Sequence, residues 1–333
     1  MSPQVPPGAA RAVDGVLELT VAGSFTALGY RARSRLYGWS PPEPGAMAGR
    51  TVLVTGATSG LGLAAATELA SLGARTIVLG RDAARTEAAA QRIAAGTGND
   101  AVEPVVADLA DLSAVAAVAE ALLERLSGLD VLINNAGALT HDRVITRDGL
   151  ELTYQTHVVA PFLLVDRLMP LLQGRPASRV ITVSSGGMYA QGLDLRALRR
   201  GGEEYDGVRA YARAKRAQVV LNQRWAATAA SPPVFHAMHP GWADTPGVVQ
   251  SLPSFHRTVG RFLRTPQQGA DTIVWLASAE EPAHSTGRFW LDRRPRGTVR
   301  LPWTSTSADQ ARLLWDMVVA DAGAAGRLTG PSS

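Results

Sequence analysis

Between residues 50 and 295, hydrophobic and polar positions follow two alternating patterns. Short β-branched apolar segments are each followed by a longer segment rich in alanine and leucine with helical periodicity. This alternation is typical of βαβ units, which build a parallel sheet with helices on both faces. We therefore predict a doubly wound α/β domain with a sheet of about seven strands. The predicted strands are residues 51–56, 76–81, 103–109, 130–136, 179–185, 233–238 and 288–292.

The residues before this domain follow a different pattern. Residues 1–10 are rich in proline, glycine and alanine, and we expect them to be disordered. Residues 14–35 have apolar positions at helical spacing, with Asp14 as the expected N-cap. Three arginines, at positions 31, 33 and 35, end this helix. Its long apolar face favours contact with a membrane surface or with a second subunit.

Three segments follow from these patterns. We predict an N-terminal tip, helical arm and proline-rich linker over residues 1–45, a single α/β domain over 46–300, and a C-terminal extension over 301–333. The family resemblance described below implies that the segment near residues 241–265 covers a substrate site.

Composition excludes several classes of protein. The chain has 333 residues, of which 46% are hydrophobic and 19% are charged, which indicates a globular protein. Without cysteine it has no disulfide or thiolate metal site, and its six histidines lack metalloprotease spacing, so we expect no metal. The net charge is only +4 with scattered arginines, and we expect no nucleic-acid partner. We see neither a signal peptide nor a membrane span, and expect a cytoplasmic protein or one attached at a membrane surface.

A glycine-rich turn follows the first predicted strand. Residues 55–62 read TGATSGLG and lead directly into an alanine-rich helix. Glycines let the backbone approach a pyrophosphate, and the helix N-terminus supplies unpaired N–H groups and a positive dipole. An ordinary tight turn would have the same composition, but the order strand, turn, helix favours a phosphate site.

Only one of the 33 basic residues is a lysine, Lys215, and it lies four residues after Tyr211. Residues at this spacing share one face of a helix. A nearby ammonium group can lower the pKa of a phenol, which is ordinarily about 10, toward neutral pH. The alternative is an accidental pair on an exposed helix face.

Taken together, these motifs resemble the short-chain dehydrogenase/reductase family. The resemblance covers residues 50–295 and rests on the glycine-rich turn, the Asn134-Asn135-Ala136-Gly137 segment, a serine on the fifth strand and the Tyr211/Lys215 pair, in that order. Segments 179–188, 239–248 and 287–290 resemble one subfamily. The family implies a Rossmann-type fold and an oxidoreductase that interconverts a carbonyl and an alcohol. It also implies frequent homo-oligomers.

The resemblance assigns roles to individual residues. Tyr211 would be the general acid/base, Ser185 the donor to the substrate oxygen, and Lys215 the cation that lowers the pKa of Tyr211 and binds ribose. Ser184 is the alternative to Ser185. The expected cofactor contacts are Gly56, Thr58, Ser59, Gly60, Leu61, Gly62, Arg81, Asp108, Leu109, Asn135, Ala136, Gly137, Tyr211, Lys215, Pro240, Gly241 and Thr245.

One catalytic position departs from the family pattern. His157 stands where the family usually has an asparagine that holds a water relaying protons from the lysine. Imidazole can both donate and accept a proton, so His157 is a candidate catalytic residue. Alternatively it is a core histidine and the relay is altered, which favours a cofactor-binding protein without catalysis.

The cofactor is expected to be NADP rather than NAD. In doubly wound folds an acid near the end of the second strand binds the ribose 2′-hydroxyl of NAD, whereas an arginine suits the 2′-phosphate of NADP. The resemblance places that acid at Gly80, where it is absent, and Arg81 follows. In the other interpretation Arg81 only faces solvent and Asp82 caps the next helix.

The substrate is expected to be a bulky hydrophobic carbonyl or alcohol, such as a steroid, a retinoid or a long-chain ketone. Residues 248–262, where the family covers its substrate, are rich in apolar side chains. A helix packed only as core would have the same composition. Combined with the apolar arm, this leaves a membrane-peripheral, lipid-modifying enzyme as a further alternative.

Overall fold

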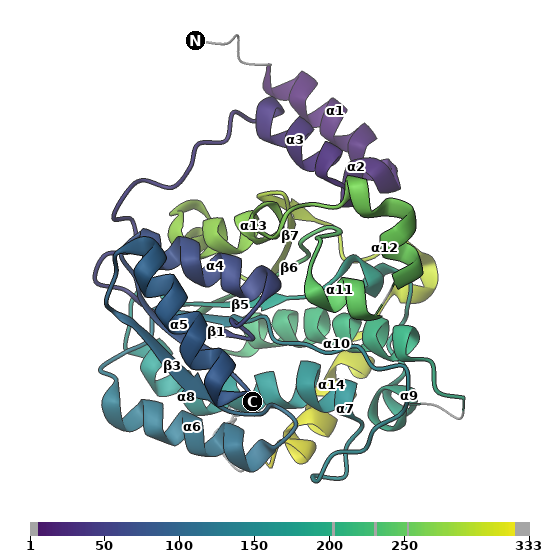
Figure 1. Cartoon of the computed structure of the whole chain (residues 1–333). Coiled ribbons are helices and arrows are strands. Elements are labelled where there is room, and N and C mark those ends of the chain that lie inside the picture. Colours follow the sequence, from purple (N-terminus) through teal and green to yellow (C-terminus); the bar gives the residue numbers. More distant parts are fainter. Residues whose placement is uncertain (1–5, 202–203, 230–231, 252, 324–333) are drawn as a thin grey trace.

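The computed structural model describes residues 6–201, 204–229, 232–251 and 253–323. Its centre is an eight-stranded sheet in the order β3-β2-β1-β4-β5-β6-β7-β8 (Figure 1). The first seven strands are parallel and agree with the seven predicted segments, whereas β8 is antiparallel to β7 and was not predicted. The strands are β1 Thr51–Thr55, β2 Arg75–Gly80, β3 Val102–Val106, β4 Val131–Asn134, β5 Arg179–Val183, β6 Val234–Met238, β7 Arg288–Leu291 and β8 Arg294–Arg296.

The strand order reverses between β1 and β4, which are neighbours in the sheet. At such a reversal the connections leave in opposite directions, and a crevice opens outside the carboxyl ends of the strands. A ligand site is therefore expected at the ends of β1, β4 and β5.

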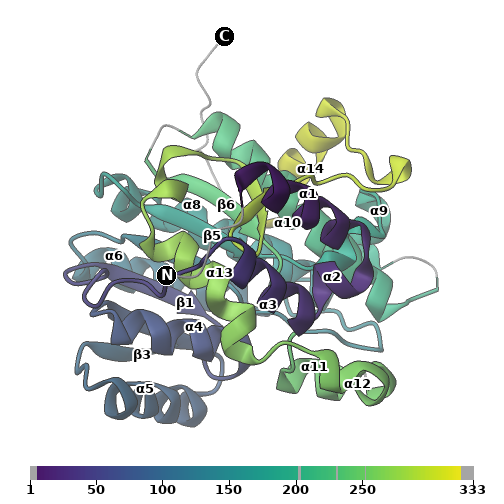
Figure 2. The ribbon, with the colours of Figure 1, turned by 90° about the horizontal axis from the view of Figure 1, so that it is seen from above.

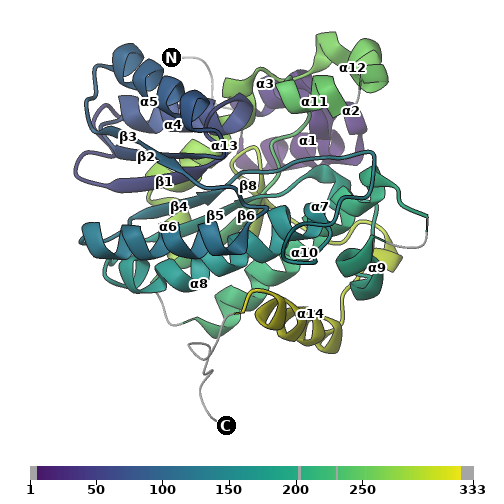
Figure 3. The ribbon, with the colours of Figure 1, turned by 60° about the horizontal axis from the view of Figure 1, so that its bottom comes forward.

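Two layers of helices cover the sheet (Figure 3). Side chains of successive strand residues point to opposite faces, so Val52 and Val54 pack with one layer and Leu53 with the other. One layer consists of α4 Gly60–Ser71, α5 Ala83–Thr97 and α13 Pro266–Ser278. The opposite layer consists of α6 Leu112–Arg125, α8 Ala160–Gln173, α10 Gly207–Thr228 and α14 Ala308–Asp321.

The described part of the C-terminal extension, which ends at residue 323, packs into the domain core. Leu314, Trp315 and Val318 of α14 are buried in the same cluster as Trp225 of α10. The Trp225 and Trp315 rings meet edge to face, with centroids 4.8 Å apart. We infer that α14 contributes to the stability of the layer that carries Tyr211.

Shorter elements lie mainly at the carboxyl end of the sheet and along its rim. They are α7 Leu152–Tyr154, the π-helical turn η1 Gln155–Val159, η2 Gly186–Tyr189, α9 Leu195–Arg200, α11 Pro246–Ser251, α12 Pro253–Val259, η3 Gly260–Phe262, η4 Glu281–His284 and η5 Pro302–Thr304.

The N-terminal arm is three helices, not the single helix predicted over residues 14–35. They are α1 Pro7–Leu19, α2 Val21–Phe25 and α3 Ala27–Leu36. The chain turns at Thr20 and Thr26, whose hydroxyls accept hydrogen bonds from the Gly23 and Leu28 amides at 2.9 and 3.3 Å. These are N-cap contacts, and they start a new helix at each threonine.

The start of the arm also differs from the prediction. Residues 7–10, expected to be disordered, form the first turn of α1, and Asp14 lies inside that helix instead of capping it. Seen from above, α1 to α3 lie over the domain, with α12 beside them (Figure 2).

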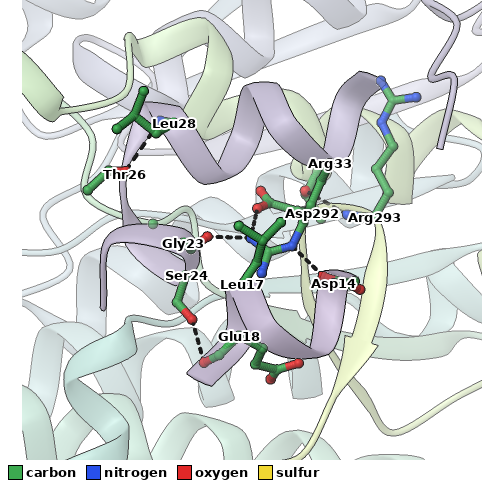
Figure 4. Close-up of polar contacts among 12 residues, drawn as sticks. Asp14, Leu17, Glu18, Gly23, Ser24, Thr26, Leu28, Arg33, Asp292 and Arg293 are labelled. Atoms are coloured by element: carbon green, nitrogen blue, oxygen red, sulfur yellow. Dashed lines mark hydrogen bonds and ion pairs between the residues drawn. The ribbon is translucent and has the colours of Figure 1, made fainter. Parts of the chain in front are cut away.

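A buried group of charges joins the arm to the domain (Figure 4). Arg33 is fully buried, and its guanidinium contacts Asp14 at 2.6 Å and Asp292 at 2.9 Å. Asp292 also pairs with both terminal nitrogens of buried Arg264, at 2.5 and 2.9 Å. The neighbouring residues Arg31 and Arg35 are exposed and suggest a basic surface. Arg33 does not belong to such a surface, because its side chain is buried.

Candidate active site

The glycine-rich turn between β1 and α4 is pressed against the end of β4. A Cβ atom on Gly56, which has φ +66°, would lie 2.7 Å from the Cα of Ala136. A Cβ on Gly62 would lie 2.4 Å from both Asn135 Nδ2 and the Gly56 carbonyl. Only glycine fits such a close approach. The first turn of α4, which begins at Gly60 after the N-cap residue Ser59, therefore opens at the strand ends as a cradle for phosphate groups.

Hydrogen bonds of Asn135 stabilise this cradle. Its side-chain amide donates to the Thr55 carbonyl at 2.9 Å, and the Thr55 hydroxyl accepts the backbone N–H groups of Asn135 and Ala136 at 3.0 Å. The asparagine was predicted to contact the adenosine ribose. Its side chain holds the glycine turn against β4, a role that the sequence did not reveal.

The end of β2 has no room for an acidic side chain at the position that selects NAD. A Cβ on Gly80 would lie 2.3 Å from Thr86 Oγ1 and 2.6 Å from the methyl group of Thr58. Arg81 is exposed next to this point. Asp82 caps α5, and its carboxylate accepts the Arg85 amide at 2.8 Å. The helix-capping role that the alternative interpretation gave to Asp82 is therefore present.

The predicted adenine contacts lie after β3. The Asp108 carboxylate accepts the Ala110 amide at 2.9 Å, and Leu109 is buried. This bond fixes the loop that leads into α6. Asp108 thus has a structural role in addition to the predicted contact.

Ser184 and Ser185, which follow β5, have different surroundings. Ser184 is buried, and its hydroxyl donates to the Lys215 carbonyl at 2.8 Å, so it supports α10. The Ser185 side chain lies beside Tyr211 and lowers the pKa of its phenol. Its oxygen also accepts the Gly187 amide at 3.2 Å. Of the two serines, the geometry favours Ser185 as the partner of the tyrosine.

Tyr211 and Lys215 are not an accidental surface pair, because Lys215 is buried and Tyr211 is half-buried. The Lys215 ammonium lies 5.5 Å from the centroid of the Tyr211 ring. Burial lowers the pKa of Lys215 to about 7. Burial raises the pKa of Tyr211, and the hydrogen bond from Ser185 offsets only part of that rise. The net direction for Tyr211 is opposite to the lowering that the sequence led us to expect.

His157 lies in the π-helical turn η1, beside Tyr211. The two rings are perpendicular, with centroids 5.3 Å apart. Nε2 of His157 lies 2.7 Å from the carbonyl oxygen and 3.1 Å from the amide nitrogen of Ala138. Burial, together with the charge of Lys215, lowers the pKa of His157 to about 3. The imidazole is therefore neutral near pH 7. Its contact with Ala138 joins the segment after β4 to η1.

A small cavity of about 30 Å³ lies behind His157. Its wall includes Asn134, His157, Gln218 and Asn222. Within the described part of the chain, Nδ1 of His157, Oε1 of Gln218 and both amide atoms of Asn222 are buried without a hydrogen-bond partner. A polar cavity of this size has room for an ordered water. No sequence pattern indicates this group, because its members come from three separate elements.

The segment after β6 returns to the glycine cradle. A Cβ on Gly60 would lie 3.3 Å from the Cβ of Thr245, so the two predicted cofactor contacts are neighbours. Pro240 is buried, and Gly241 has φ +73°. Leu61 is in close contact with α13, because a Cβ on Gly269 would lie 2.5 Å from its Cδ2.

The expected substrate cover forms α11, α12 and η3. Residue 252, one of its predicted apolar positions, lies outside the described residues. Phe262 is 38% exposed at the end of this cover. Sequence reasoning missed Phe25 of the arm, which contacts Trp242 ahead of this cover, because its partners are distant in the chain.

Comparisons with known proteins agree with this geometry. The family model "short chain dehydrogenase" matches residues 50–253. Human (Homo sapiens) dehydrogenase/reductase SDR family member 12 is 42% identical over 265 residues, covering 79% of this chain and 82% of that protein. Mouse (Mus musculus) retinol dehydrogenase 14 is 34% identical over 295 residues, covering 83% of this chain and 86% of that protein. The first relative confirms the subfamily resemblance inferred from the three sequence segments.

A solved structure shows the same arrangement of elements. It is a candidate NAD(P) dependent gluconate 5-dehydrogenase from Beutenbergia cavernae with bound NADP at low occupancy. Its TM-score is 0.59 at 28% identity, over 74% of this chain and 96% of that one.

Proposed function

Because the chain belongs to the short-chain dehydrogenase family, we propose that it is an NADP(H)-dependent oxidoreductase that interconverts a carbonyl and an alcohol on a hydrophobic substrate. One observation carries the proposal. Ser185 and Tyr211 lie together at the carboxyl end of β5, at the same edge of the sheet as the glycine cradle.

The chemistry follows from what a carbonyl oxygen needs during reduction. A bound nicotinamide supplies or accepts the hydride. As charge develops on the substrate oxygen, the Ser185 hydroxyl donates a hydrogen bond to it and the Tyr211 phenol delivers a proton. The raised pKa of Tyr211 keeps the phenol protonated at neutral pH, as an acid requires. The Lys215 ammonium lies 5.5 Å from the centroid of the Tyr211 ring and would bind the nicotinamide ribose.

The choice of NADP rests on the end of β2. Thr58 and Thr86 fill the space in which an acid at position 80 would stand, and exposed Arg81 offers a guanidinium to the 2′-phosphate. The Beutenbergia structure described above was solved with NADP, which is consistent with this choice.

A hydrophobic substrate is supported by the apolar sequence of the α11–α12 cover. The relative that shares 34% identity is named for retinol, an apolar alcohol. We extend that class of substrate, and not retinol itself, to this chain.

The proposal is tested with a panel of hydrophobic carbonyls and NADPH, followed by Tyr211→Phe. We expect a drop in kcat on the order of 10²-fold or more for this variant, with NADPH affinity near wild type, because only the proton donor is lost. Tyr205→Phe, which removes a phenol hydroxyl bonded to Glu151, is the control and should stay active. Activity that survives Tyr211→Phe contradicts the assignment. A wild type that binds NADPH but turns over no carbonyl favours a binding protein without catalysis.

A second candidate role, peripheral contact with a membrane, is favoured by the outer face of the arm. Val16 and Leu19 of α1 are 64% and 88% exposed, and Leu28 of α3 is 56% exposed. Arg31 and Arg35 share the exposed side of α3 with Leu28, because positions three, four and seven apart lie on one helix face. Apolar side chains flanked by arginines suit an anionic bilayer surface. No helix in the described ranges is both long and apolar enough to cross a membrane.

Sedimentation with anionic vesicles tests this contact, and solution mass tests the alternative of a second subunit. Leu19→Asp should abolish co-sedimentation, whereas Leu313→Asp, on the exposed side of α14, should not. Equal behaviour of both variants and the wild type would leave the arm without a membrane role.

A further inference from the structure

We propose that Phe25, in the N-terminal arm, is a positioning residue of the active site that fixes both the 185–187 turn and the 240–242 segment. The inference rests on the function proposed above. It extends the site to a part of the chain outside the residues that match the family model.

The first contact of Phe25 is with the turn that carries Ser185. A Cβ on Gly186 would lie 1.9 Å from Cε1 of the phenyl ring, so the ring lies directly against this glycine. The next residue, Gly187, donates its amide to the Ser185 hydroxyl oxygen at 3.2 Å. The ring therefore confines the turn that sets the orientation of the Ser185 hydroxyl beside Tyr211.

The second contact of Phe25 is with the predicted cofactor segment after β6. Its carbonyl accepts the Trp242 amide at 2.7 Å, and its ring stacks on the Trp242 indole with centroids 5.3 Å apart. A Cβ on Gly241 would lie 2.7 Å from the same carbonyl. One residue thus touches the ends of β5 and β6, where the family places the catalytic serine and a cofactor loop.

Buried charges hold the backbone on the N-terminal side of Phe25. Arg33 donates to the Gly23 carbonyl at 2.6 Å, and Arg264 donates to the Ser24 carbonyl at 3.2 Å (Figure 4 shows the first). Both guanidinium groups are fully buried and share Asp292 as an anion. Phe25 is 9% exposed, so its ring is fixed by packing as well. Such rigid support is what holds a reacting group within the small tolerance that catalysis requires.

Phe25→Ala and a matched control, Leu28→Ala, test the proposal in the full chain. Both remove an apolar side chain from the arm, but Leu28 is exposed. We expect Phe25→Ala to lower kcat on the order of tenfold or more, because a small displacement of Ser185 strongly affects the reaction, and to weaken NADPH affinity by a smaller factor, because the 240–242 segment loses one of its contacts. Leu28→Ala should match wild type. Phe25→Leu, which keeps most of the packing, should lie between them.

The pH profile of kcat separates positioning from a general loss of stability. Because the bond from Ser185 lowers the pKa of Tyr211, a displaced serine should move the Tyr211 limb of the profile to higher pH in Phe25→Ala. A merely destabilised enzyme would keep the wild-type profile.

A double mutant tests the contact itself. Gly186→Ala should lower kcat in the wild-type background, because its Cβ has no space beside the phenyl ring. In the Phe25→Ala background the same substitution should cost much less, so the two effects should not add.

Each other outcome identifies what has failed. If the wild type is active and Phe25→Ala changes neither kcat nor its pH profile, this inference is overturned and the proposed function stands. A fall in turnover that only matches a fall in the fraction of protein able to bind NADPH, with wild-type affinity in that fraction, would assign Phe25 to folding alone and also overturns it. A wild type that reduces no carbonyl defeats the proposed function, and this inference with it.

Discussion

The Lys215 ammonium donates a 2.8 Å hydrogen bond to the backbone carbonyl of Val183, the last residue of β5. The chain thus keeps its one lysine in a buried space between the end of the sheet and the Tyr211 ring. An ammonium is a compact charge, whereas a guanidinium is a wide planar fork with five donors. The position therefore requires lysine and not simply a positive charge.

We expect Lys215→Arg to be nearly as damaging as Lys215→Ala, for both turnover and NADPH affinity. The fork would have to displace either the phenol or the Val183 carbonyl. Steady-state kinetics and calorimetric titration of both variants check this, with the exposed swap Arg209→Lys as the control. Near-normal activity in Lys215→Arg would contradict the assigned role.

NADPH affinity should weaken as the pH rises above about 7. Burial lowers the pKa of Lys215 to about 7, so the free enzyme loses the ammonium that would bind ribose as pH rises through that value. A ligand that prefers the protonated form binds less tightly above the pKa of the free protein. Titrations across this range should show the step in wild type and not in Lys215→Arg. A flat wild-type curve would show that Lys215 does not contribute through its charge.

NADPH should bind at least tenfold more tightly than NADH, a difference of about 1.4 kcal/mol. Arg81 is the partner we assign to the 2′-phosphate, so Arg81→Ala should bring the two affinities together. Arg85→Ala, on the first turn of α5, is the matched control and should keep the preference. The assignment fails for equal wild-type affinities, or for a preference for NADH that survives Arg81→Ala.

His157→Asn should keep or raise activity. The amide restores the residue type that the family uses at this position. We expect this change to leave the pH profile near neutrality unaltered, because burial lowers the pKa of His157 to about 3 and the wild-type ring is already neutral there. His157→Phe keeps the ring and loses the contact with Ala138, so it should lower kcat. Equal activity of the two variants would remove His157 from the site.

Asp292→Asn should lower the free energy of unfolding by roughly 3 to 5 kcal/mol, because it leaves two buried guanidinium groups without their shared anion. Chemical denaturation measures the loss. The control is Asp309→Asn, which breaks a pair on the surface of α14 and should change stability little. A small effect of Asp292→Asn would mean that the arm is held by its apolar contacts.

The sheet and the proximity of the candidate site residues could be predicted because their signals are local. Gly56, Gly60 and Gly62 sit within one turn, and Tyr211 and Lys215 within one helical turn, so spacing alone placed them together. The choice of Ser185 over Ser184 required one further fact, namely which of the two side chains faces the site at the end of β5. The hydrogen bond from Ser184 to the Lys215 carbonyl supplies this fact.

The arm and the last hairpin could not be predicted in the same way. Arg33 stands between two exposed arginines, and its burial depends on an aspartate 259 residues further on. The turn before β8 is made by Asp292 and Arg293, both with φ +54°, where glycine or asparagine is the usual signal. The Arg293 guanidinium donates to the Asp271 carboxylate at 2.9 and 2.6 Å, which holds Arg293 in this turn. No local sequence pattern predicts this contact.

That long separation has a consequence for the order in which the chain acquires its structure. The arm leaves the ribosome first, whereas Asp292 and Arg296, its partners, are made near the end. Contacts this far apart carry a large loop-closure cost until the intervening residues have folded. We expect the arm to dock last, on a domain already formed. Pulsed hydrogen exchange during refolding would then find the amides of α3 protected after those of β1 and β4.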